Sequence, residues 1–81
     1  MIVRALFFAS YRDLAGTDEL DVELAGGDRV ADLVHQLRSS GGSWTRLPEA
    51  PVVAVNMTYA PLTTRLEPGD EVAFIPPVSG G

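Results

Sequence analysis

The residues best suited to chemistry lie at the end of the sequence, where Val78, Ser79, Gly80 and Gly81 follow Pro77. None of these side chains is charged, so the only ionised group is the terminal carboxylate. Pro77 fixes its own φ and disfavours helix at the preceding residue, which predicts an extended exit from the domain. Glycine has no Cβ, so the walls of a partner could close on bare backbone. We expect these five residues to form an extended, flexible tail that carries the carboxylate of Gly81 into a buried site.

The carboxylate of Gly81 needs activation, because its leaving group would otherwise be oxide. Transfer to AMP gives an acyl-adenylate, which a sulfur nucleophile converts to a thiocarboxylate and an amine converts to an isopeptide bond. Either product requires an unhindered terminal glycine and no catalytic side chain on this chain. Another interpretation is that residues 79–81 are a frayed end without function, because chain termini are commonly mobile.

The other polar residues do not match a catalytic or metal-binding pattern. His35 is the single histidine and the chain has no cysteine, which excludes thiolate metal sites and a cysteine nucleophile. The acidic residues between positions 18 and 23 are typical of a solvated strand face, and the Gly-Gly pairs do not match a phosphate-binding loop. We therefore expect no self-contained active site and no cofactor bound by this chain, so that a partner must complete any chemistry.

Length and charge limit the classes of protein that fit. The chain has 81 residues, 46% of them hydrophobic, which predicts one small globular domain. The net charge of −5 argues against nucleic acid and anionic membranes and favours a partner with a basic face. The apolar run at residues 1–9 is interrupted by Arg4 and is too short to cross a membrane. We expect a cytoplasmic protein.

Hydrophobic periodicity predicts strands separated by one long amphipathic helix. The expected strands are residues 2–9, 17–24, 52–56, 58–62 and 71–75. Apolar residues at helical spacing, from Val30 to Leu37, follow Asp28 as an expected N-cap, and Gly41 and Gly42 are expected to end this helix. In the following loop, Trp44 and Leu47 are expected to fold back onto the core. This order predicts a single sheet wrapped around one helix.

Strand parity places three large apolar residues on solvated surfaces near the tail. Phe8 shares a face with Arg4, and Ile75 shares a face with Glu71. Tyr59 lies at an expected turn. If Phe8, Tyr59 and Ile75 lie together, they form an apolar patch that would dock a partner. The alternative is that these side chains seal a sheet edge or cover the core.

Several segments of the sequence resemble a known family of sulfur carriers. They are residues 6–9, Arg12, residues 16–17, residues 54–56, residues 69–74 and residues 76–81. The combination of Gly-Asp-Glu-Val-Ala-Phe with a final Pro-Pro-Val-Ser-Gly-Gly resembles the small subunit of molybdopterin synthase. That subunit belongs to the MoaD group of ubiquitin-like (β-grasp) sulfur carriers, which is related to the thiamine sulfur carrier ThiS. The resemblance spans the whole chain and is weakest over residues 39–50.

The resemblance implies a fold and a route for sulfur. The fold would be α+β, a ubiquitin-like β-grasp over residues 1–76, with a mixed sheet of four to five strands wrapped on one main helix. A ubiquitin-activating-like adenylyltransferase, using ATP and Mg, would adenylate Gly81, and a sulfur donor would then supply the thiocarboxylate. The tail would enter the large subunit of molybdopterin synthase, within a heterotetramer, and give sulfur to the pterin precursor of the molybdenum cofactor.

The resemblance also bears on docking and on the alternatives. Phe8, Tyr59 and Ile75 fall where the family's apolar docking residues lie. The chain would be a non-catalytic, sulfur-donating subunit of a transferase. Two other functions remain open: a sulfur carrier for thiamine, cysteine or tRNA thiolation, and a ubiquitin-like modifier conjugated through Gly81 to a target lysine.

Overall fold

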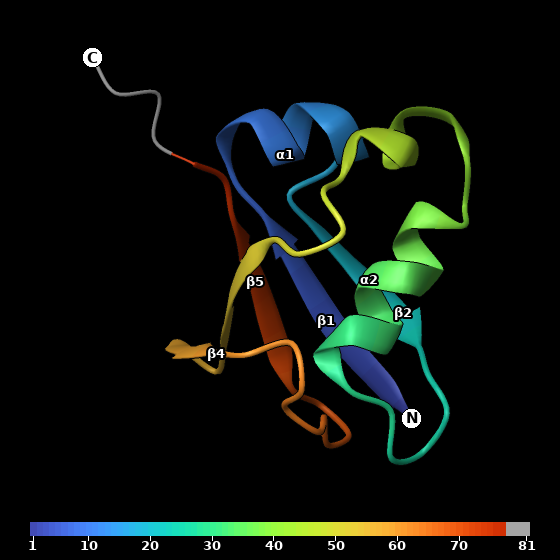
Figure 1. The fold of residues 1–81 in the computed structure, drawn as a ribbon, viewed down its shortest axis with the longest axis vertical. Helices are drawn as coiled ribbons and strands as arrows, with labels where there is room; N and C mark the ends of the chain where they lie inside the picture. The colour runs from blue at the N-terminus through green and yellow to red at the C-terminus, as the bar shows by residue number, and fades with distance from the viewer. Residues whose placement is uncertain (78–81) are drawn as a thin grey trace.

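A computed structural model describes residues 1–77, so the expected tail residues Val78, Ser79, Gly80 and Gly81 lie outside the described part of the chain. The elements in chain order are β1 (Ile2–Phe7), α1 (Ala9–Ala15), β2 (Glu19–Glu23), α2 (Val30–Arg38), the 3₁₀ helix η1 (Gly42–Arg46), β3 (Val52–Val55), β4 (Thr58–Ala60) and β5 (Glu71–Ile75) (Figure 1). The predicted order of the strands and the long helix is therefore confirmed, and the 3₁₀ helix is an addition. The first strand is shorter than predicted, because Ala9 already begins α1.

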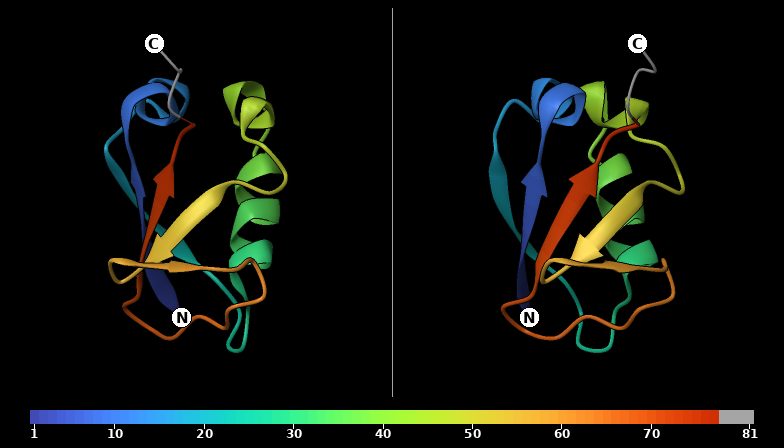
Figure 2. Two further views of the ribbon diagram at one scale, coloured as in Figure 1. Left: turned by 60° about the vertical axis from the view of Figure 1, so that its left-hand side comes forward. Right: turned by 90° about the vertical axis from the view of Figure 1, so that its left-hand side faces the viewer.

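The five strands form one mixed sheet in the order β2-β1-β5-β3-β4. β5 is the central strand, and it runs parallel to β1 and antiparallel to β3. β1 and β2 form an antiparallel pair, with α1 in their connection. Helix α2 lies across one face of the sheet, while the other face carries no helix within residues 1–77 (Figure 2). We call this uncovered side the outer face. The architecture is the ubiquitin-like β-grasp that the resemblance implied.

The core lies between the sheet and α2. The strands contribute Val3, Ala5, Phe7, Val53, Val72 and Phe74, all of which are buried. The helix contributes Val30, Leu33, Val34 and Leu37, which are the residues at helical spacing in the sequence. Phe7 and Phe74 are neighbours across the parallel pair, and their rings stack with centroids 5.4 Å apart. Strand parity therefore assigned the core face correctly.

Phe74→Ala should strongly destabilise the domain. Phe74 is fully buried at the centre of the sheet, and its removal leaves a cavity that costs about 3–5 kcal/mol. That cost is a large part of the roughly 5–15 kcal/mol that stabilises a typical domain. Urea unfolding measures the change. The half-exposed Phe8 is the matched control, and a Phe8→Ala variant that lost as much stability would contradict this assignment of the core.

Both predicted ends of α2 are wrong. Arg29, not Asp28, is the N-cap residue, and Asp32 accepts a hydrogen bond from the Arg29 N–H at 2.7 Å. The Asp28 carboxylate accepts instead from the Ala25 N–H, within the turn before the helix. At the other end the helix stops at Arg38, because Ser39 already caps it before the chain reaches Gly41 and Gly42.

The segment after α2 confirms one prediction and refines another. Leu47 is buried, and the ring of Trp44 lies 5.4 Å from that of Phe7, so both residues fold back onto the core. The predicted loop is partly a 3₁₀ helix, in which Gly41 and Gly42 adopt positive φ angles. Neither α-helix within residues 1–77 has the length and apolar character needed to cross a membrane.

Candidate functional site

The described part of the chain ends shortly after the central strand. β5 ends at Ile75, and Pro76 and Pro77 are the last two described residues. An apolar groove of about 390 Å³ lies at this end of β5. Its lining residues are Tyr11, Pro48, Ala50, Pro51, Val52, Ile75, Pro76 and Pro77. Four of these eight residues are prolines, whose rings fix the local backbone, so the groove has a stiff lining.

Tyr11 forms one wall of this groove. It is the buried residue of α1, and burial raises the pKa of its hydroxyl above the usual value. Gly16 ends α1 in the left-handed conformation, with φ of 75°, which glycine adopts without strain. Helix α1 thus positions Tyr11 in the same groove as Pro76 and Pro77.

The outer face carries the predicted docking residues. Phe8 is 48% exposed, and its extended backbone continues the alternation of β1, so its side chain points away from buried Phe7. Phe7 is paired with Phe74 in the parallel register. The next residues of the two strands, Phe8 and Ile75, therefore lie side by side on the outer face. Ile75 is partly rather than fully exposed, which corrects the expectation for that residue.

Tyr59 lies two strands away from Ile75 on the same face. It is 73% exposed and belongs to β4, not to a turn as expected. Tyr59 is opposite Ala54, and Ala54 is opposite Ala73 of β5. The register therefore places Phe8, Ile75 and Tyr59 on one face of the sheet. The residues between Tyr59 and Ile75 on this face include alanines, whose side chains are small.

Two further exposed apolar residues, one on this face and one at a turn, were missed from the sequence. Val52 is opposite Ile75 and is 57% exposed, whereas Met57 at the β3–β4 turn is 94% exposed. The run Val52-Val53-Ala54-Val55 is apolar throughout, so alternation gave no sign of which residues face outward. The outer patch is defined here as Phe8, Val52, Tyr59 and Ile75.

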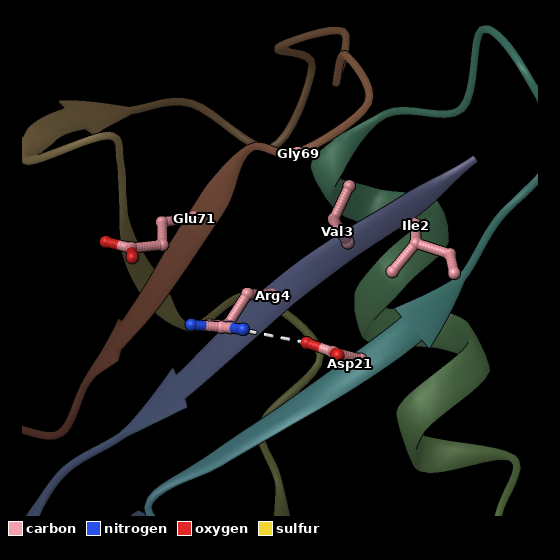
Figure 3. A pocket seen from close by; sticks show the side chains of 6 residues that line it. All are labelled: Ile2, Val3, Arg4, Asp21, Gly69 and Glu71. Carbon is pink, nitrogen blue, oxygen red and sulfur yellow. Dashed lines mark hydrogen bonds and ion pairs between the residues drawn. The ribbon is translucent and has the colours of Figure 1, made fainter.

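Charged residues occupy the part of the outer face remote from the tail exit. The Arg4 Nε donates to Asp21 at 3.3 Å, and Arg4 lies 3.8 Å from Glu19. Figure 3 shows Arg4 between Asp21 of β2 and Glu71 of β5. The hydrogen bond to Asp21, followed by the charges of Glu19 and Asp21, raises the pKa of Arg4. Three carboxylates surround one guanidinium, so this region is net acidic.

His35, the single histidine, is exposed on α2. Within residues 1–77, no group of three or more His, Asp or Glu residues is arranged to hold a metal ion. The features that remain are the tail exit, the outer patch and the acidic region beside it. Together with the fold they define a class of protein: a small ubiquitin-like β-grasp domain.

Comparison with known proteins places the chain in a family. The model of the ThiS family matches residues 5–81. A molybdopterin synthase sulfur carrier subunit from Chlamydomonas reinhardtii is 36% identical over 83 residues, covering 100% of both chains. The chain therefore belongs to the ThiS family.

Solved structures agree with this assignment. The structure of SAMP1 from Haloferax volcanii superposes with a TM-score of 0.86 at 28% identity, covering 100% of both chains. A complex of subunits 1 and 2 of the molybdopterin-converting factor from Helicobacter pylori contains a chain of the same fold, with a TM-score of 0.72, 22% identity and coverage of 100% of both chains.

Proposed function

We propose that this chain is the sulfur carrier subunit of a molybdopterin synthase. The observation that carries the proposal is the match, over the full length of both chains, to a relative that bears this name. The fold supports it, because the central strand ends at the exit of a segment that finishes in Gly80 and Gly81. In this proposal residues 1–76 are the docking domain and residues 77–81 are the tail that enters the partner.

The carboxylate of Gly81 is the group that carries sulfur. It attacks the α-phosphorus of ATP in an activating enzyme that uses Mg, and pyrophosphate leaves. Hydrosulfide from the sulfur donor then attacks the carbonyl carbon of the acyl-adenylate, and AMP departs with the electron pair of the C–O bond. The resulting thiocarboxylate provides the sulfur that is transferred to the pterin precursor.

The outer patch docks the partners of the carrier. Phe8, Tyr59 and Ile75 supply apolar area on a face that no helix covers within residues 1–77. The large subunit of the synthase is the receiving partner, and the tail exit lies beside Ile75 at the edge of the patch. The acidic region is suited to basic residues at the rim of the interface.

Intact-mass spectrometry tests the proposal. The chain is incubated with the activating enzyme, ATP, Mg and a sulfur source, and it should gain the mass that corresponds to one oxygen replaced by sulfur. The mass gain should appear in the C-terminal fragment. An unchanged mass in the presence of an enzyme that thiolates a known carrier would reject the proposal.

A second candidate is a protein modifier conjugated through Gly81. The likeness to SAMP1 favours it, because another SAMP1 structure, from Methanosarcina acetivorans, is described as a small archaeal modifier protein. Conjugates of higher mass, formed in cells by the intact chain and lost when Gly81 is deleted, would support this candidate. A sulfur carrier for thiamine, cysteine or tRNA thiolation would show the mass gain but would not support synthesis of the molybdenum cofactor.

A further inference from the structure

Met57 occupies a position that glycine would fill with less strain. It forms the β3–β4 turn together with Asn56, between the paired residues Val55 and Thr58. Both turn residues have positive φ angles, 49° for Asn56 and 72° for Met57. A two-residue turn of this kind strongly prefers Asn followed by Gly, because a side chain at the second position is crowded. Met57 nevertheless carries a large apolar side chain, which is 94% exposed.

The turn that presents Met57 is firmly held to the central strand. The Asn56 side-chain amide donates to Asp70 at 2.9 Å, and its carbonyl oxygen accepts from the Glu71 N–H at 3.0 Å. The Asn56 N–H donates to the Glu71 carbonyl oxygen at 2.8 Å. Three hydrogen bonds therefore hold Asn56 to the two residues at the start of β5. Met57 thus projects from a fixed support, which lowers the conformational entropy that a partner would have to remove on binding.

The surroundings of Met57 are acidic. Asp70 and Glu71 lie beside the turn, and Glu71 also flanks Arg4 on the outer face (Figure 3). An apolar side chain with carboxylates around it is complementary to an apolar pocket with a basic rim. Tyr59 of the outer patch is two residues further along the same hairpin, so Met57 is close in sequence to that patch.

We propose that Met57 is a specificity-determining contact of the docking surface, and that it inserts into a basic-rimmed apolar pocket on the large synthase subunit. This inference rests on the proposed function. The large subunit is the chosen occupant because the named relative is a subunit of that enzyme, and because subunits 1 and 2 of the H. pylori converting factor form a complex. This contact is the functional reason for placing methionine at a position of positive φ.

Two substitutions of Met57 separate binding from strain. Met57→Gly removes both the side chain and the strain, whereas Met57→Gln removes the apolar contact and keeps the positive φ strain. Both variants should bind the large subunit about tenfold more weakly by calorimetry, since about 1.4 kcal/mol is a tenfold change in Kd. Met57→Gly should also raise the Tm by about 2–5 °C, while Met57→Gln should leave it unchanged. The matched control is Leu20→Gln, because Leu20 is also an exposed apolar residue but is opposite core-facing Ala5 on edge strand β2.

A third variant tests the basic rim. Glu71 contacts Asn56 through its backbone, so Glu71→Gln leaves the turn intact. This variant should bind more weakly at low salt and show a shallower dependence of affinity on salt than the unaltered chain.

The outcomes distinguish this inference from the function on which it rests. If the unaltered chain binds the large subunit but both Met57 variants bind equally well, Met57 is not a contact and only this inference fails. A loss of affinity for the activating enzyme alone would also overturn it, because the occupant would be different. If the unaltered chain does not bind the large subunit at all, the proposed function fails together with the inference.

Discussion

A chain that lacks Gly81 is expected to accept no sulfur. The proposed reaction takes place at the carboxylate of this residue, and a chain that ends at Gly80 presents its carboxylate one residue short of the site. One residue of extended chain spans about 3.3–3.6 Å, which exceeds any reach that the reacting atoms could tolerate. The expected result is complete loss of the sulfur-dependent mass gain and of cofactor synthesis.

The same deletion should leave the fold unchanged. Within residues 1–77, the buried core residues lie between Val3 and Phe74, so we expect the loss of Gly81 to leave them undisturbed. The Tm should therefore equal that of the intact chain. Ser79→Ala is the control, because it keeps the length of the tail and should keep sulfur transfer. Persistent thiocarboxylate formation by the shortened chain would show that Gly81 is not the carrier.

Phe8→Asp should abolish stable docking. Phe8 is half-exposed in the free chain and lies beside Ile75 on the outer face. In a closed interface, an unpaired carboxylate at this position costs about 3–5 kcal/mol. At about 1.4 kcal/mol for each tenfold change, the Kd for the large subunit should rise by at least about 100-fold. Calorimetry with the purified subunit measures this change.

Loss of affinity by Phe8→Asp cannot be ascribed to unfolding. Phe8 is the N-cap residue of α1 and makes no side-chain capping hydrogen bond. Aspartate is among the preferred N-cap residues, so the substitution should maintain or raise the stability of the domain. Phe8→Tyr, which keeps the aromatic ring, should bind normally. An unchanged Kd for Phe8→Asp would remove Phe8 from the docking surface.

The parts of the fold that were predictable are those with strict alternation or helical spacing. β5 was predicted to the residue, because Val72 and Phe74 alternate with solvated neighbours between clear turn residues. The core side of α2 was predicted for the same reason. Such patterns can be recognised because burial of one face requires an apolar residue at every second position of a strand and at every third or fourth position of a helix.

The start of α2 was not predictable from local sequence. The N–H groups of Val30 and Ala31 donate to the carbonyl oxygens of Thr64 and Leu62, which lie more than 30 residues away. These partners satisfy the first turn of the helix without the side chain of Asp28, which is therefore free to close the preceding turn. The choice of N-cap residue depended on tertiary contacts.

The candidate site was only partly predictable. The aromatic and apolar character of Phe8 and Tyr59 was visible, and parity placed Phe8 on the outer face. Met57 falls between the predicted strands 52–56 and 58–62, and its exposure and positive φ were not predictable, since they depend on the way Asn56 bonds to Glu71 at the start of β5. The chemistry expected of residues 78–81 belongs to a part of the chain outside the described residues.

The position of β5 has a mechanical consequence for any partner that grips the chain beyond Pro77. Tension applied there runs along a strand that is bonded to β1 on one side and to β3 on the other. Extracting that strand would require both ladders to shear together, because neither can be peeled open one bond at a time from this direction. A force that a partner applies to the end of the chain is therefore distributed over both hydrogen-bond ladders of β5 before either of them breaks.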